Sequence, residues 1–255
     1  MKFALLAGLF FITALLYASV GFGGGSTYTA LLIMSGTDYR LVPIIALCCN
    51  ILVVSGNAVR YGREGLIAWG RIWPLICLSI PAAWIGGRID LPQHIFIALL
   101  AVALFIAGVR LLAAQNPVAA QTETRHTPIW ASAIIGGSIG FYAGLVGIGG
   151  GIFLAPILHI LRWGKAKAIA ATCSLFILVN SIAGISGQFT KLNNLSLAGD
   201  ALAFWPLLPA VFIGGFIGNH LGVFKLPELW LKRITGVLIL AVALRLSLKW
   251  LILIA

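Results

Sequence analysis

The stretch Val20-Gly21-Phe22-Gly23-Gly24-Gly25-Ser26 decides how this chain folds, because a near copy, Val146-Gly147-Ile148-Gly149-Gly150-Gly151-Ile152, lies in a second apolar segment. Each copy places four glycines within five residues. A glycine inside a helix costs about 1 kcal/mol relative to alanine and leaves the backbone free to turn. The pattern predicts that the helix breaks at both glycine motifs (residues 21–25 and 147–151). In hydrocarbon, such a break is tolerated only where the freed N–H and C=O groups face protein or water. We therefore expect the two breaks to meet at a cavity.

The composition indicates a membrane protein. Of 255 residues, 61% are hydrophobic and 9% are charged, which excludes an ordinary soluble domain. Several apolar runs approach the roughly 20 residues that a spanning helix needs. The net charge of +11 could indicate nucleic-acid binding, but the Lys and Arg residues stand singly or in small groups beside apolar segments. That arrangement sets membrane topology. We expect a multi-pass protein that contacts the lipid bilayer and binds no nucleic acid.

The chain divides into two membrane repeats, residues 1–112 and 129–255, joined by a polar linker at 113–128. In each repeat an apolar segment leads to the glycine break, a short arm and three further apolar spans. The spacing supports a duplication: Gly21 and Gly147 are 126 positions apart, and Arg110-Leu111 matches Arg245-Leu246 at 135.

The positions of Lys and Arg predict that the two repeats have opposite orientations. In the first repeat the richest basic cluster follows the first full span, whereas in the second it precedes the matching span; the clusters are Arg60, Arg63, Arg71 and Arg162, Lys165, Lys167. Since cytoplasmic loops carry an excess of Lys and Arg, Arg63 and Lys165 should lie on the cytoplasmic side, with Asp38 and Lys191 on the other. The predicted fold is an all-α polytopic membrane protein with two inverted repeats, each a re-entrant or broken-helix hairpin plus three spanning helices.

Inverted repeats with discontinuous helices are typical of transporters. The N-terminus of a half-helix presents unpaired N–H groups and the positive end of the helix dipole to a substrate at the midplane. Here the two N-termini would follow Gly25 and Gly151, and their natural ligand is an anion. The alternative is that the glycines serve only close helix packing. Two symmetric motifs favour the functional interpretation.

Polar side chains within the spans are further candidates, because each is costly in lipid and normally faces the bundle interior. Asn50 and Asn57 are seven residues apart and share a helix face. We expect that an amide is not satisfied within its own helix, so that it indicates an interhelical bond or a substrate contact. For Ser and Thr, a bond to the preceding turn is the simpler explanation. The candidate substrate-binding residues are Gly23, Gly24, Gly25, Ser26, Thr27, Asn50, Asn57, Gly149, Gly150, Gly151, Thr172, Ser174 and Asn180.

No charged side chain is expected at the middle of the membrane. All six carboxylates fall at predicted joints, which argues against a carboxylate relay for protons or sodium; they are Asp38, Glu64, Asp90, Glu123, Asp200 and Glu228. His159 ends the second arm and is expected at the membrane interface. Arg110 and Arg245, which match in the two repeats, are expected to reach opposite surfaces. The substrate would then be held by dipoles, without a fixed countercharge.

Enzyme motifs are missing from the sequence. It contains no HExxH motif and no Cys/His spacing suited to zinc, so we expect no enzymatic activity, no metal and no cofactor. The four cysteines fall within predicted spans and are expected to be buried small hydrophobes; they are Cys48, Cys49, Cys77 and Cys173. An intramembrane enzyme and a passive anion channel are the alternatives, although a channel has no need of two broken segments in inverted halves.

Taken together, the motifs resemble the TauE/SafE sulfite exporter family, also called the toluene sulfonate uptake permease family. The resemblance rests on the two glycine motifs, on Ile85-Gly86-Gly87 with Ile213-Gly214-Gly215, and on Ala171-Thr172-Cys173-Ser174, and it covers nearly the whole chain. It implies a multi-pass inner-membrane transporter of small sulfur-containing anions such as sulfite, sulfoacetate or sulfonates. The first arm departs from the family's commoner pattern, because it lacks the proline that the second has at Pro156. A homodimer is a further expectation.

Overall fold

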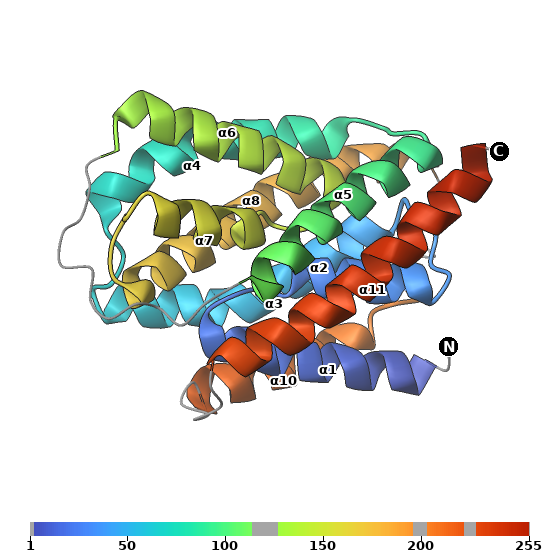
Figure 1. The fold of residues 1–255 in the computed structure, drawn as a ribbon, viewed down its shortest axis with the longest axis horizontal. Coiled ribbons are helices and arrows are strands. Elements are labelled where there is room, and N and C mark those ends of the chain that lie inside the picture. Colours follow the sequence, from blue (N-terminus) through green and yellow to red (C-terminus); the bar gives the residue numbers. More distant parts are fainter. Residues whose placement is uncertain (1–2, 114–126, 196–202, 222–227, 255) are drawn as a thin grey trace.

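The structure is a computed structural model that describes residues 3–113, 127–195, 203–221 and 228–254. Within these ranges the regular elements are all α-helices, as the composition predicts (Figure 1). They are α1 (Phe3–Val20), α2 (Gly25–Met34), α3 (Val42–Arg63), α4 (Trp69–Arg88), α5 (Gln93–Leu112), α6 (Ile129–Val146), α7 (Gly151–Ile160), α8 (Ala166–Leu195), α10 (Leu207–Leu221) and α11 (Glu228–Ile254). Most of the predicted linker, and with it Glu123, lies outside the described residues, as does Asp200.

Both glycine motifs break the helix where the sequence predicts. The helix α1 ends at Val20 and α2 begins at Gly25, while α6 ends at Val146 and α7 begins at Gly151. Gly24 (φ 83°) and Gly150 (φ 81°) cap the short helices in the left-handed conformation, which residues with a Cβ adopt only at a cost. The paired helices also agree in length, with 18 residues in α1 and α6 and 10 in α2 and α7.

The described helices run back and forth along one bundle axis. In Figure 1, α1 starts at the right and α6 starts at the left, and the two chain ends lie at the same end of the bundle. The helix α3 ends, and α8 begins, at the left of the same view. Five helical segments among the described residues are long and apolar enough to cross a membrane, judged by length and composition: Phe3–Val20, Val42–Arg63, Gln93–Leu112, Ile129–Val146 and Ala166–Thr190.

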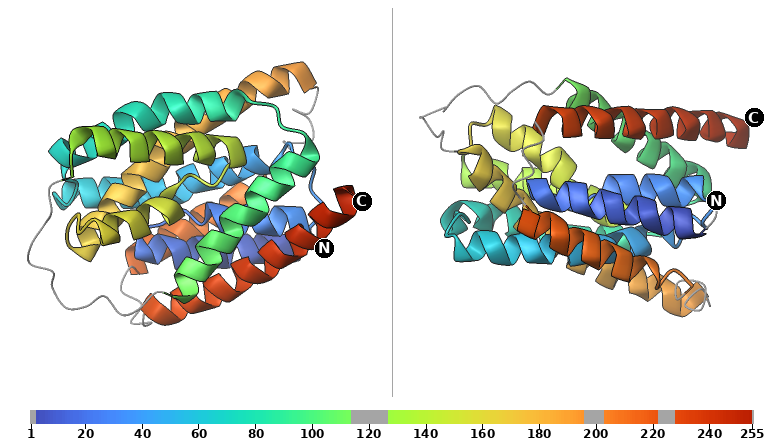
Figure 2. Two further views of the ribbon diagram at one scale, coloured as in Figure 1. Left: turned by 45° about the horizontal axis from the view of Figure 1, so that its top comes forward. Right: turned by 90° about the horizontal axis from the view of Figure 1, so that it is seen from below.

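The two halves interlock rather than fold separately. The helix α4 of the first half packs along α6 of the second, and α1 packs along α10 in the reciprocal arrangement (Figure 2). The pairs α5 with α11 and α3 with α8 each join a helix to its counterpart in the other half. Because most of the extensive contacts connect the halves, each half depends on the other for its buried surface.

Glycines allow the reciprocal helix pairs to approach closely. On α6 three glycines spaced by four residues face backbone of α4: Gly136, Gly140 and Gly144. On α10, Gly214 and Gly218 face the carbonyl oxygens of Phe11 and Leu15 of α1 in the same way. A Cβ at any of these positions would collide with a carbonyl oxygen, so only glycine permits this backbone contact.

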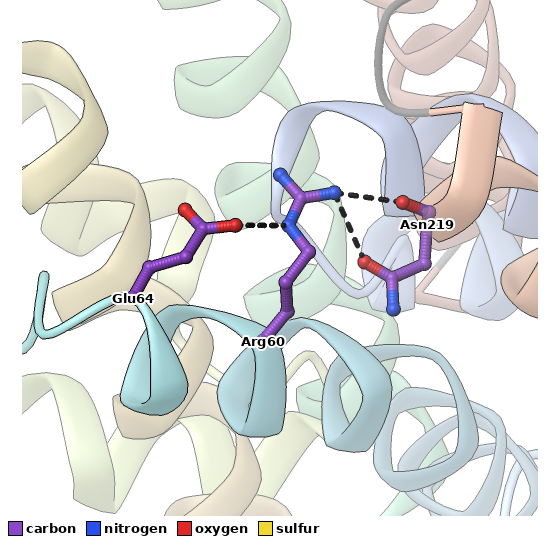
Figure 3. Close-up of polar contacts among 3 residues, drawn as sticks. All are labelled: Arg60, Glu64 and Asn219. Carbon is purple, nitrogen blue, oxygen red and sulfur yellow. Dashed lines mark hydrogen bonds and ion pairs between the residues drawn. The ribbon is translucent and has the colours of Figure 1, made fainter.

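Arg60 joins α3 to the C-terminal end of α10, as Figure 3 shows. Its Nη1 donates to the backbone oxygen of Asn219 at 2.7 Å and to Oδ1 of the same residue at 3.3 Å, while Nε lies 3.3 Å from Oε1 of Glu64. The last carbonyls of a helix lack partners and carry partial negative charge. The guanidinium therefore caps α10 from the opposite half.

One cysteine departs from the prediction of burial. Cys49 and Cys173 are buried and Cys48 is half-buried, but Cys77 is exposed on the outer face of α4. In a membrane an outward-facing small apolar side chain meets lipid, so the hydrophobic pattern cannot separate this face from the core.

Replacing Gly140 with alanine should destabilise the α4–α6 pair. The added Cβ would lie 2.5 Å from the carbonyl oxygen of Ser79, and relieving this overlap should cost about 1–3 kcal/mol. Unfolding in detergent measures the change. Gly8→Ala in α1 is the matched control, because its Cβ would meet no atom within 4 Å. Equal stability of the two variants would contradict the packing role of Gly140.

Candidate functional site

A cavity of about 400 Å³ lies between the two glycine motifs. Both halves form its walls: α1 and the first turn of α2 on one side, α7 and the start of α8 on the other, with the end of α5 across them. The volume falls in the range of about 300–1,000 Å³ that holds small molecules. The predicted site residues that line it are Gly23, Gly24, Gly25, Ser26 and Gly151.

Two short helices begin at this cavity. Gly25 and Gly151 are the first residues of α2 and α7, and both line the cavity. Neither helix has a side-chain cap on its N-terminus. The first N–H groups of a helix have no partner within the helix, and an uncapped N-terminus leaves them available, together with the positive end of the dipole. The geometry therefore favours a negatively charged ligand.

Asn50 links the two glycine motifs. Its side chain is fully buried, and Nδ2 donates to the carbonyl oxygen of Ile148 at 3.2 Å. The amide lies against the first motif as well, because a Cβ added to Gly23 or Gly25 would meet it at 2.5 Å. Asn50 does not line the cavity. Nδ2 of this amide therefore bonds across the two halves, while Oδ1 has no hydrogen-bond partner among the described residues.

Ser174 makes the reciprocal bond from the other half. Its Oγ donates to the carbonyl oxygen of Gly21 at 2.5 Å, within the buried interior. A helix of each half, α3 or α8, therefore satisfies a carbonyl of the opposite glycine motif. Because an unpaired carbonyl in a dry interior is costly, these two bonds stabilise both breaks.

The other predicted polar residues lie near the cavity but not in its wall. Thr27 shares a 3.0 Å hydrogen bond with Tyr17, whose side chain does line the cavity. The hydroxyl of Thr172 donates to the carbonyl oxygen of Ala168, one turn earlier in the same helix, as expected for a threonine within a span. Asn180 Nδ2 donates to Phe176 of its own helix at 2.8 Å. Oδ1 of Asn180 has no hydrogen-bond partner among the described residues, so its own helix satisfies only half of this amide.

Three more predicted residues also stand outside the cavity wall. Asn57 is fully buried and has no hydrogen-bond partner among the described residues. Gly149 lies against the amide of Asn50, and Gly150 packs on α6 and α8 as the cap of α7. Gly149 and Gly150 therefore pack against the polar and apolar side chains behind the motif.

Arg110 also lines the cavity, although the sequence does not single it out as a site residue. The sequence predicts that it reaches a membrane surface, and the structure leaves its side chain exposed in the last turn of α5. In the structure the end of α5 lies beside α7, so Arg110 is both exposed and part of the cavity wall. His159 of α7 lines the same cavity. In the sequence, Arg110 is marked only by its match with Arg245, and this match does not show which helix lies opposite Arg110.

The fold and the cavity define an all-helical, multi-pass membrane protein with a small-molecule cavity between two broken helices. The family model described as sulfite exporter TauE/SafE matches residues 5–246. The chain belongs to this family of membrane transporters, which confirms the resemblance found in the sequence.

Two relatives agree with this assignment. The chain is 33% identical over 243 residues to the "Probable membrane transporter protein y4hK" of Sinorhizobium fredii, covering 94% of this chain and 96% of the relative. It is 23% identical over 262 residues to the "Probable membrane transporter protein MamO" of Magnetospirillum gryphiswaldense, covering 88% of this chain and 41% of that longer relative. No solved structure matches the chain.

Removing either bond from α3 or α8 to the glycine motif of the opposite half should lower stability. Asn50→Ala and Ser174→Ala each leave a buried carbonyl without its partner, which costs about 1–3 kcal/mol. Ser55→Ala on α3 and Thr172→Val on α8 are the controls, because these hydroxyls bond only their own helices. Unfolding in detergent compares the four variants. If the controls lose as much stability as the test variants, the bonds between the halves have no special role.

Proposed function

We propose that this chain is a secondary transporter that carries small sulfur-containing oxyanions, such as sulfite, sulfoacetate or a small sulfonate, across the inner membrane. The supporting observation is that the uncapped N-termini of α2 and α7, together with Arg110, converge on one cavity. Membership of the TauE/SafE family supports the same substrate class.

Electrostatics favour an anion over a cation or a neutral solute. Each helix N-terminus stabilises a negative charge by roughly 0.3–2 kcal/mol, and the guanidinium of Arg110 adds a charged donor. The described residues that line the cavity include no Asp or Glu. An oxyanion accepts several hydrogen bonds at once, which suits backbone N–H groups and the hydroxyl of Ser26.

The rest of the wall suits a small organic part on the substrate. Apart from the glycine motifs, the lining comes largely from apolar side chains such as Val20, Phe22 and Ile177. A sulfonate or sulfoacetate would place its charged oxygens at the helix N-termini and its carbon atoms against these side chains. The cavity volume of about 400 Å³ leaves room for an ion of this size with water around it.

We infer that the two repeats are inverted and that the cavity faces the cytoplasm. Opposite starting ends for α1 and α6 support the inversion. The cavity reaches His159 at the end of α7 and Ala166 at the start of α8, directly beside the basic cluster around Lys165. A surplus of Lys and Arg is typical of the cytoplasmic side.

The proposed function is tested by counterflow in liposomes that contain the purified protein. Sulfite or a small sulfonate should drive exchange and compete with the other members of a panel that includes sulfoacetate, taurine, sulfate and thiosulfate, whereas cations should not. Counterflow separates a transporter from a passive channel. A transporter uses an outward gradient of unlabelled substrate to accumulate labelled substrate inside the liposome, whereas a channel does not. A purified, folded protein that exchanges none of these anions would refute the proposal.

Gly24→Ala should reduce this exchange strongly, because Gly24 lines the cavity and caps α2. The matched control is Gly36→Ala. Both glycines have φ 83°, so both variants carry the left-handed strain of about 1–2 kcal/mol, but a Cβ at Gly36 would meet no atom within 4 Å. If the two variants exchange anions at equal rates when equal amounts of folded protein are compared, Gly24 is not part of the substrate site.

The orientation is tested by cysteine accessibility in a chain whose four cysteines are replaced by alanine. Arg63→Cys and Lys165→Cys should react with an impermeant maleimide only from the cytoplasmic side, and Asp38→Cys only from the outside, because the basic clusters fix the orientation. External labelling at position 165 would contradict the inverted arrangement.

A further inference from the structure

The two halves match in sequence but not in their state of packing. The short helices α2 and α7 are equivalent, yet eight of the ten residues of α2 are buried and four of the ten residues of α7. Of the six residues of α7 that are not buried, four line the cavity: Ile152, Pro156, His159 and Ile160. The structure is therefore open on the α7 side and closed on the α2 side.

The same difference separates α5 from its counterpart α11. Leu111 of α5 is half-buried and lines the cavity. Its equivalent, Leu246 of α11, is 2% exposed and belongs to the same buried cluster as Tyr28 and Leu32 of α2. The helices α11 and α2 are in contact and their side chains Leu246, Tyr28 and Leu32 are buried, whereas α5 and α7 border the cavity.

An arginine precedes each of these two leucines. Arg110 is exposed and lines the open cavity, whereas Arg245 is exposed on α11, directly before the packed Leu246. Neither arginine forms an ion pair with a carboxylate in the part of the chain that the structure describes. Within the described residues, no carboxylate therefore neutralises either guanidinium group. A guanidinium binds the oxygens of an oxyanion with two parallel N–H donors.

We propose that Arg110 and Arg245 are a pair of substrate-positioning residues that act in turn. In the conformation described here, Arg110 attracts the anion into the cytoplasmic cavity and passes it to the N-termini of α2 and α7. In the opposite conformation, α2 separates from α11 as α7 closes on α5, and Arg245 takes the same position at a cavity open to the outside. The proposal rests on the proposed transport function.

The physical reason for two arginines is that each conformation needs its own entrance. An exposed cation raises the local concentration of anions and speeds their entry. A cation at the midplane would instead bind the anion through the whole cycle and slow its release. Arginines near the two mouths give attraction on both faces while the central site keeps only dipoles.

Sided transport kinetics test the proposal. Arg110→Gln should raise the KM for anion supplied at the cytoplasmic face by about tenfold, the effect of losing one charge-assisted contact, with little change at the outer face. Arg245→Gln should do the reverse. Arg110→Lys and Arg245→Lys should recover part of the loss, because the charge remains. Arg63→Gln, which removes an exposed arginine outside the cavity wall, should change neither KM.

The outcomes separate this proposal from the proposed function. A wild-type protein that transports no anion refutes the function itself. If the wild type transports and both glutamine variants change the same face, or neither face, the alternating role of the arginines is refuted.

Cysteine reactivity gives a second measurement that needs no turnover. In the cysteine-free background, Leu111→Cys should react from the cytoplasmic face and Leu246→Cys from the outer face. A saturating concentration of sulfite on one side should shift the two reactivities in opposite directions. A Leu246→Cys variant that folds but stays unreactive from both faces, under either gradient, would show that no second cavity forms and would overturn the proposal.

Discussion

The structure depends on how two broken helices keep their backbone polar groups satisfied in a membrane. Each unsatisfied N–H or C=O group in hydrocarbon costs several kcal/mol, so neither break is stable facing lipid. The chain places the two breaks together. Asn50 then supplies a donor to Ile148 of the second motif, and Ser174 supplies one to Gly21 of the first. These two carbonyls are paired within the protein, and the uncapped first residues of α2 and α7 line the cavity.

The interlocked packing of the halves follows from the same requirement. If each half folded alone, its break would lack the partner that lies on the other half. The glycine contacts between α4 and α6, and between α1 and α10, bring the halves close enough for those bonds to form. Backbone-to-backbone packing of this kind is also how helices associate in lipid, where no hydrophobic effect drives them together. The packing of the two halves is therefore also what forms the site.

The charge distribution around the cavity fits a protein that must release what it binds. The central site is formed by dipoles and hydroxyl groups, and the guanidinium of Arg110 belongs to an exposed side chain. A buried arginine at the centre would bind an anion more strongly but would carry a large desolvation cost when the site is empty. Family membership alone does not indicate this arrangement, which comes from the position of α5 beside α7.

The sequence by itself determined the membrane class and the places where the helices break, because these depend on local composition: apolar length and four glycines within five residues. It also predicted that Gly23, Gly24, Gly25, Ser26 and Gly151 belong to the site, and these line the cavity. Only the tertiary structure decided which polar side chains reach that cavity. Asn50 and Ser174 bond the opposite motif, Asn180 bonds its own helix, and Arg110 joins the wall. The reason is that helix periodicity fixes the face on which a side chain lies, whereas its partner is set by the packing of distant helices.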